Sequence, residues 1–190
     1  MGRASDVTDL GDGTVLRVGG SPEREARIMT LARSAGYPVP RVHEVRDGAL
    51  VLERVVGPTM GNDMARHPWR IGHHVRTLVD LHSRLHAIPY QDGTLLHFDL
   101  HPDNVLISRT GPIVIDWTNA HAGEPDSDVA MTWLILATSA GRVGRVIAWL
   151  FASRAGRASI LSGLEAAKTF RLADPNVTPI ERTRVGLAWP

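Results

Sequence analysis

The spacing of apolar residues changes at Gly57-Pro58, and this change constrains the fold more than any other feature of the sequence. Upstream of this point, short apolar runs are separated by turn-forming residues. Downstream of it, apolar residues recur at three- and four-residue steps. The first spacing is typical of strands and the second of helices. We therefore expect a strand-rich part of the chain to be followed by a mostly helical part.

Two β-hairpins are predicted in the upstream part, around Asp12-Gly13 and Asp47-Gly48. An Asp-Gly pair between apolar runs favours a tight turn, because glycine accepts positive φ freely. The predicted strands cover residues 6–10, 14–18, 41–45 and 49–55. Between the hairpins, Ser21-Pro22 is typical of a helix start, with serine as the N-cap and proline at the first helical position. Gly36 is expected to end this helix.

The downstream part is predicted to contain a long amphipathic helix from Trp69 to His86 and a very apolar helix from Asp126 to Ala140. Two or three further helices would follow. Short strands are expected at residues 95–99, 105–107 and 113–116. The order of elements predicts an α+β fold with two lobes, a small β-rich lobe over residues 1–54 and a helical lobe over residues 55–190. Ligands usually bind in clefts between such lobes.

The composition limits the classes of function. The 190 residues carry a formal net charge of +1, so neither a nucleic acid nor a membrane surface is expected as a partner. The absence of cysteine excludes disulfides, thiolate metal sites and cysteine nucleophiles. Lys168 is the only lysine among 21 basic residues. No apolar run is long enough to span a bilayer, and we expect a soluble, cytoplasmic protein.

The segment from His97 to Ile107 carries the clearest chemical signal. A strand would deliver His97 and Asp99 into a loop, where Pro102 stiffens the turn and Asn104 presents an amide before the next strand. Twelve residues further on, Asp116 ends an apolar run. Phosphoryl transfer requires these groups: one carboxylate that takes the proton of the attacking hydroxyl, and a second carboxylate and an amide oxygen that hold magnesium against the phosphates.

These residues resemble the aminoglycoside phosphotransferase family, which has a protein-kinase-like fold. His97 to Leu106 is similar to its catalytic loop H-x-D-x-x-P-x-N, and Ile115-Asp116-Trp117 is similar to the Asp-Phe-Gly element of kinases. The resemblance implies that Asp99 is the catalytic base and that Asn104 and Asp116 bind Mg²⁺. It also implies ATP or GTP as the phosphoryl donor and a small hydroxylated molecule as the acceptor. Asp128 resembles the acid that braces the catalytic loop.

The resemblance extends upstream of the catalytic loop. Arg17 matches the basic residue that contacts the nucleotide phosphates, and Glu25 matches the acid that pairs with it. The segment from Glu53 to Val55 resembles the hinge, whose backbone would bind the base of the nucleotide. The glycine-rich phosphate loop of the family would precede Val7, where only residues 2–5 offer candidates, so the small lobe is expected to be truncated.

Two other functions fit parts of the pattern. His97, Asp99 and His101 alternate, and on an extended strand they could form the zinc site of a hydrolase. A pseudokinase that binds nucleotide without turnover would fit the short phosphate loop. Other side chains have plainer interpretations. His97 is expected to be a structural hydrogen-bonding residue, and Trp133 and Trp149 are expected to be core residues.

Overall fold

The computed structural model describes residues 6–139, 141–175 and 177–190. Its strands are β1 (Asp6–Asp9), β2 (Thr14–Val18), β3 (Val42–Arg46), β4 (Ala49–Glu53), β5 (Pro89–Tyr90), β6 (Gly93–Leu96), β7 (Val105–Ser108), β8 (Gly111–Val114) and β9 (His121–Gly123). Its helices are α1 (Pro22–Ser34), α2 (Met60–Arg66), α3 (Ile71–His86), α4 (Pro125–Ser139), α5 (Gly141–Ala155), α6 (Arg157–Ala173) and α7 (Pro179–Leu187), with short 3-10 turns η1 (Pro68–Arg70) and η2 (Pro102–Asn104). Residues 2–5, proposed above as a remnant of the phosphate loop, lie outside the described ranges.

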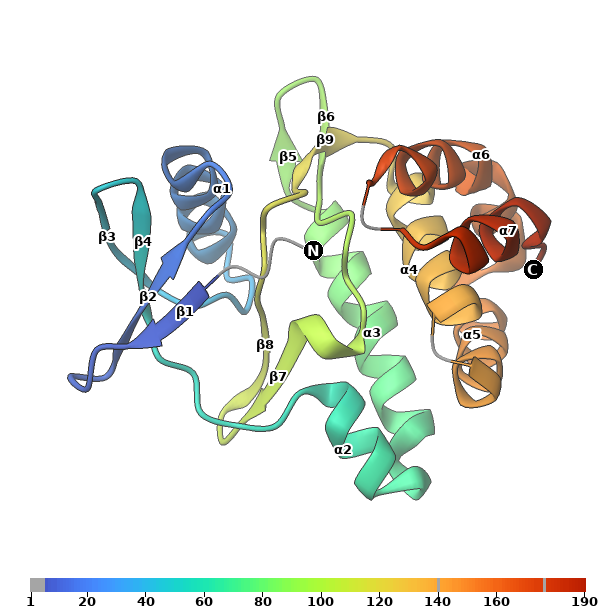
Figure 1. Cartoon of the computed structure of the whole chain (residues 1–190), viewed down its shortest axis with the longest axis horizontal. Coiled ribbons are helices and arrows are strands. Elements are labelled where there is room, and N and C mark those ends of the chain that lie inside the picture. Colours follow the sequence, from blue (N-terminus) through green and yellow to red (C-terminus); the bar gives the residue numbers. More distant parts are fainter. Residues whose placement is uncertain (1–5, 140, 176) are drawn as a thin grey trace.

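The first four strands form one antiparallel sheet in the order β1-β2-β4-β3, which confirms both predicted hairpins. Helix α1 packs on this sheet, as Figure 1 shows, and buries Ile28, Met29 and Ala32. The helix begins at Pro22 as predicted, but the Ser21 side chain makes no capping hydrogen bond. Instead the Ser21 backbone N–H donates to Glu25 Oε1 at 3.3 Å.

The helical part is organised around α3 and α4. The apolar face of α3 is buried through Val75, Leu78, Leu81 and Leu85, in line with the three- and four-residue spacing of the sequence. The α-helix starts at Ile71, later than predicted, because the chain from Pro68 to Arg70 forms the 3-10 turn η1. Helix α4 packs against both α5 and α6, and α5, α6 and α7 are the further helices that were expected (Figure 1).

The approach of α6 to α4 is close enough to require a glycine. A Cβ atom added at Gly163 would lie 2.1 Å from the backbone oxygen of Asp126. No side chain larger than hydrogen fits at this separation unless the two helices move apart. Helix α4 corresponds to the helix predicted from Asp126 to Ala140, and Ala140 itself lies outside the described residues.

Two predicted strands end earlier along the chain than expected, and both differences concern the site. The strand expected to reach Asp99 ends at Leu96, and the strand expected to reach Asp116 ends at Val114. Phe98 and Asp116 both have φ of 61°, which a pleated strand cannot contain. His97, Asp99 and Asp116 therefore lie in loops. Strand β9, which pairs with β6, and helix α2 were not predicted.

The segment between β4 and α2 connects the sheet to the helical part, and its Pro58 backbone oxygen accepts a hydrogen bond from Ile107 N at 2.8 Å. Close packing continues there, since a Cβ atom on Gly57 would lie 2.1 Å from the Ile107 backbone oxygen. Among the described helices, none combines the length and apolarity required to cross a membrane.

Candidate active site

Arg17 links the small sheet to the loop that follows β8. It lies on β2, is 7% exposed, and forms an ion pair with Glu25 of α1. Its other terminal nitrogen donates to Asp116 Oδ1 at 2.9 Å and also to the Thr118 hydroxyl. Burial raises the pKa of the Glu25 carboxyl, and the positive charge of Arg17 acts in the opposite direction. The planar guanidinium thus holds carboxylates from two parts of the chain 91 positions apart.

Asp116 is held in an unusual backbone conformation. Its φ of 61° lies in the left-handed region, which is uncommon for a residue other than glycine and often marks a functional site. The loop is secured on both sides. Trp117 is buried and donates from Nε1 to Val114 O at 3.1 Å, and the Thr118 hydroxyl donates to Asp116 Oδ1 at 2.8 Å. Within the described chain, Asp116 Oδ2 accepts no hydrogen bond.

Asp99 and Asn104 face each other across the turn of the catalytic loop. The Asn104 side-chain amide donates to Asp99 O at 2.9 Å and to Asp99 Oδ2 at 3.1 Å. His101 Nε2 lies 3.7 Å from Asp99 Oδ1. Burial raises the pKa of the Asp99 carboxyl, and the neighbouring His101 acts in the opposite direction. A carboxyl group with a raised pKa is a stronger base than an ordinary aspartate, which suits proton abstraction.

Magnesium is bound by hard oxygen donors, and the site supplies them. The side-chain nitrogen of Asn104 donates to Asp99. The side-chain oxygen of Asn104, Oδ1, accepts no hydrogen bond among the described residues. Oδ2 of Asp116 is free in the same sense. These two oxygens, one neutral and one anionic, form a donor set that fits Mg²⁺ completed by phosphate oxygens and water.

Asp128 holds the start of the catalytic loop through backbone groups. It is fully buried and accepts hydrogen bonds from His97 N at 3.2 Å and Phe98 N at 2.8 Å. Its Oδ2 atom also lies 2.9 Å from His86 Nε2. Burial alone would raise the pKa of Asp128, but hydrogen bonds from His82 and His86 lower it well below the usual range. The position fits the bracing role expected from the sequence.

His97 lies beneath the loop rather than in the site. It is fully buried, its Nε2 pairs with Ile115 O at 3.1 Å, and burial lowers its pKa to about 4. These contacts agree with the structural role predicted for it. Residues 97–101 are not a strand, and the three side chains do not share one side: His101 lies 3.7 Å from Asp99, whereas His97 is bonded to Ile115 O. Among the described residues, the group of histidine and acidic side chains close enough to share a metal ion is His82, His86 and Asp128. The zinc hydrolase alternative thus loses its geometric basis.

A cavity of about 300 Å³ lies between the sheet and the catalytic loop. Its lining includes six of the seven site residues predicted from the sequence: Arg17, Glu25, Glu53, Val55, Asn104 and Asp116. Apolar side chains, among them Val15, Met29 and Leu106, form the rest of its wall. Asp99 does not line this cavity and is connected to it through Asn104. Sequence reasoning missed Thr118, whose hydroxyl joins Arg17 to Asp116 and which no motif singled out.

A second cavity, of about 510 Å³, opens on the other side of the catalytic loop. The loop contributes His101, Pro102 and Asp103, and the remaining wall comes mainly from apolar residues of α2, α4 and α5. Arg171 of α6 also lines it, and its guanidinium pairs with Glu181 at 2.7 Å and with Asp174 at 3.7 Å. The catalytic loop therefore separates two cavities of different character.

The antiparallel sheet with its single packed helix, the catalytic loop and the helical part together define a protein-kinase-like fold. Residues 89–161 match the sequence model of the Phosphotransferase enzyme family, so the family resemblance read from the motifs is confirmed. A curated relative, the probable serine/threonine-protein kinase BUD32 homolog of Archaeoglobus fulgidus, is 28% identical over 97 residues. That match covers 49% of this chain and 42% of the relative.

Solved structures of aminoglycoside phosphotransferases share the fold. One is a thermostable mutant of APH(4)-Ia in ternary complex with AMP-PNP and hygromycin B. It is 16% identical with a TM-score of 0.66, and the match covers 96% of this chain and 92% of that one. Another is the streptomycin-ATP-APH(2")-IIa ternary complex, at 13% identity and a TM-score of 0.65, covering 87% of this chain and 83% of that one. At these identities the similarity concerns the fold alone.

Proposed function

We propose that this protein is an ATP- or GTP-dependent phosphotransferase that moves the γ-phosphoryl group to a hydroxyl of a small molecule. The observation that carries the proposal is the convergence of Arg17, Asn104 and Asp116 on one cavity, with Asp99 joined to Asn104 at its edge. Kinase-like structures with bound ATP or AMP-PNP support the use of a nucleotide. In this proposal residues 1–54 form the small lobe and residues 55–190 the helical lobe.

The nucleotide occupies the 300 Å³ cavity. The base lies between apolar walls near Glu53 and Val55, whose backbone groups bind its edge, and the phosphates extend toward Arg17. Asn104 and Asp116 would hold Mg²⁺ through the two oxygens that have no hydrogen bond among the described residues. When bound, the ion neutralises phosphate charge. Arg17 keeps its bond to Glu25 and turns its other edge toward the phosphates, since a guanidinium can bridge two anions.

The acceptor approaches from the 510 Å³ cavity, which is lined by His101, the neighbour of Asp99 at 3.7 Å. Its hydroxyl oxygen attacks the γ-phosphorus, its proton passes to the Asp99 carboxylate, and the bond from the γ-phosphorus to the bridging oxygen breaks to release the nucleoside diphosphate. Asn104 orients Asp99 by donating to its Oδ2. The lining includes one carboxylate, that of Asp103, so a polycationic amine finds little charge to pair with there. A mostly apolar alcohol suits these walls better.

A pseudokinase function remains a second candidate because Arg17 pairs with Asp116 directly, at 2.9 Å. This ion pair neutralises the carboxylate that would bind the metal. If the Arg17–Asp116 pair persisted when nucleotide was bound, the protein would bind nucleotide without turnover. The two candidates differ in what magnesium does to nucleotide affinity.

Calorimetric titration of ATP and GTP, with and without Mg²⁺, tests this difference. In the parent protein, affinity should rise with Mg²⁺, and Asp116→Ala should abolish that dependence because one of the two donors is lost. Asp92→Asn, an exposed carboxylate on the β5–β6 turn, is the matched control and should behave as the parent. Equal affinity with and without Mg²⁺ in the parent would favour the pseudokinase. Turnover would then be sought by mass spectrometry over a panel of alcohols.

A further inference from the structure

A third cavity, of about 760 Å³, lies among α4, α5, α7 and the C-terminal residues of the chain. It faces away from the catalytic loop: Trp133 and Thr138 of α4 line it, whereas Thr132 on another face of α4 donates its hydroxyl to Leu100 O in that loop. Nothing in the proposed phosphoryl transfer uses this cavity, so its lining requires a separate explanation.

Four arginines line this cavity, and no aspartate or glutamate side chain does: Arg142, Arg145, Arg157 and Arg184. In the described ranges none of the four forms an ion pair. Arg184 donates to the backbone oxygen of Thr138 at 3.2 Å, which leaves its charge unbalanced. The residues outside those ranges, which are Met1 to Ser5, Ala140 and Asn176, include no acid. Like charges gathered without counterions repel one another, so this cluster favours an anion.

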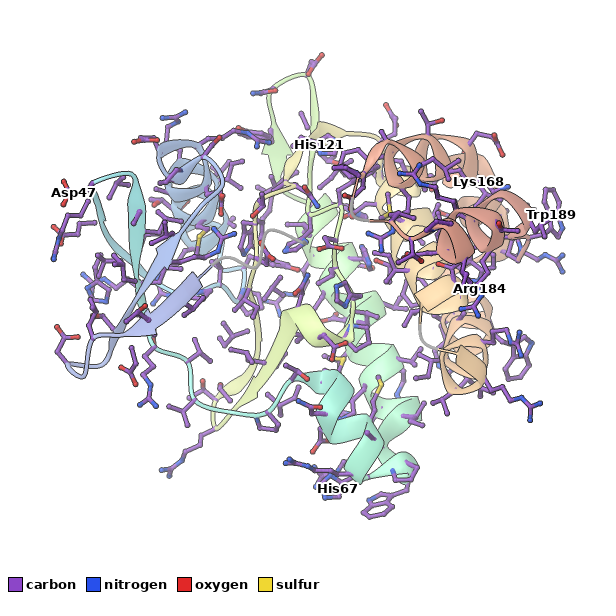
Figure 2. All side chains as sticks on the ribbon, viewed as in Figure 1. Asp47, His67, His121, Lys168, Arg184 and Trp189 are labelled. Atoms are coloured by element: carbon purple, nitrogen blue, oxygen red, sulfur yellow. The ribbon has the colours of Figure 1, made fainter. Side chains whose placement is uncertain are left out.

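Exposed indole rings accompany the arginines. Trp149 of α5 and Trp189 near the C-terminus are each 68% exposed, and both line the cavity. Figure 2 labels Arg184 and Trp189, which lie at the α7 end of the molecule, remote from the small sheet. The exposure of Trp149 corrects the expectation that it is a core residue, whereas Trp133 is buried as expected. Large aromatic rings exposed beside a cavity are typical of ligand contact surfaces.

We propose that this cavity binds a small organic anion with a flat apolar ring. The guanidinium groups would pair with a carboxylate, phosphate or sulfonate through charge-assisted hydrogen bonds. The ring would lie against the indoles of Trp149 and Trp189, and the volume falls in the range of small-molecule sites. The charge and the rings act on different parts of the ligand, so their contributions can be separated by experiment. The site does not depend on the proposed phosphotransferase activity.

The test uses two fluorescent probes that differ by one anionic group. These are 8-anilinonaphthalene-1-sulfonate and N-phenyl-1-naphthylamine, which has the same rings without the sulfonate. The sulfonate probe should bind the parent about tenfold more tightly than the neutral probe. Arg145→Gln and Arg184→Gln should each weaken the sulfonate probe about three- to tenfold and leave the neutral probe unchanged. Trp149→Ala should weaken both probes, because it removes the ring contact.

Matched variants outside the cavity serve as controls. Arg154→Gln removes an exposed arginine on α5 that bonds to Leu150 O, and Trp69→Ala removes an indole that is 76% exposed on η1. Both should bind the probes as the parent does. Circular dichroism of each variant shows that it is folded. The proposal is overturned if Arg154→Gln has the same effect as Arg145→Gln, if the two probes bind alike, or if Arg17→Ala, in the other cavity, weakens the sulfonate probe as much as Arg145→Gln does. It is equally overturned if the arginine variants lose only adsorption to phosphatidylglycerol vesicles, which would indicate a membrane surface.

Discussion

Replacing Asp128 by asparagine should destabilise the protein by roughly 2–6 kcal/mol. The substitution keeps the shape of the side chain, and Oδ1 can still accept from Phe98 N. Oδ2 becomes an amide nitrogen, which cannot accept from His97 N or from His86 Nε2. Each buried donor left without an acceptor costs about 1–3 kcal/mol. Two such donors give the stated range, a large part of the about 5–15 kcal/mol that a domain of this kind has in total.

The assay is urea unfolding followed by far-UV circular dichroism. For a slope of about 2 kcal/mol/M, the midpoint should fall by about 1–3 M while the slope stays constant. Asp92→Asn, the exposed control, should not shift the midpoint. A loss below about 0.5 kcal/mol for Asp128→Asn would refute the reasoning, because surface substitutions have effects of that size. It would mean that His97 N and His86 Nε2 find other acceptors.

The pH dependence of this effect has a definite sign. The pKa of Asp128 is lower in the folded protein than its ordinary value of 3.8, so the unfolded chain takes up the proton first as the pH falls. The stability due to the ionised carboxylate is therefore fully present above 3.8 and is lost as the pH falls toward the folded-state pKa. The difference between parent and Asp128→Asn should persist from about pH 7 to about pH 4 and shrink only below that.

Three further results are expected. Because burial raises the pKa of Asp99 and the base must be ionised, the acid limb of the kcat/KM profile should lie above the ordinary aspartate value of 3.8, as a pH-rate series would show. Arg17→Ala should weaken triphosphate binding in calorimetry by about 1.5–3 kcal/mol, Arg17→Lys should recover part of the loss, and adenosine should bind parent and variant alike. Gly163→Ala should lower the free energy of unfolding by about 1–3 kcal/mol through the clash with Asp126 O, whereas Gly72→Ala, with nothing within 4 Å, should be neutral or stabilising.

The sequence predicted the elements that depend on local signals. The hairpins at Asp12-Gly13 and Asp47-Gly48 and the apolar face of α3 formed where their turn residues and periodicity indicated. Phe98 and Asp116 were predicted to extend strands because neither is a glycine, the residue that most clearly signals positive φ. Residues distant in the sequence hold both loops: the carboxylate of Asp128 accepts from Phe98 N, and Arg17 donates to Asp116.

For the candidate site, the motif order predicted which residues would meet, and the cavity between sheet and loop brings six of them together. The contacts among them could not be predicted. Arg17 and Asp116 are 99 positions apart, and nothing local indicates that they pair directly. Trp149 shows the same limit. Helical spacing identifies its helix, but exposure depends on what packs against each face, and Trp149 is 68% exposed.

The most direct test of the central claim is the rate at which Asp99→Asn transfers the γ-phosphoryl group from ATP to an accepted alcohol, compared with the parent and with Asp92→Asn. The account predicts a rate lower by about two to four orders of magnitude in Asp99→Asn alone, the contribution of a positioned general base. Nucleotide affinity should be unchanged, since Asp99 does not line the nucleotide cavity. Near-parental turnover by Asp99→Asn would contradict the account.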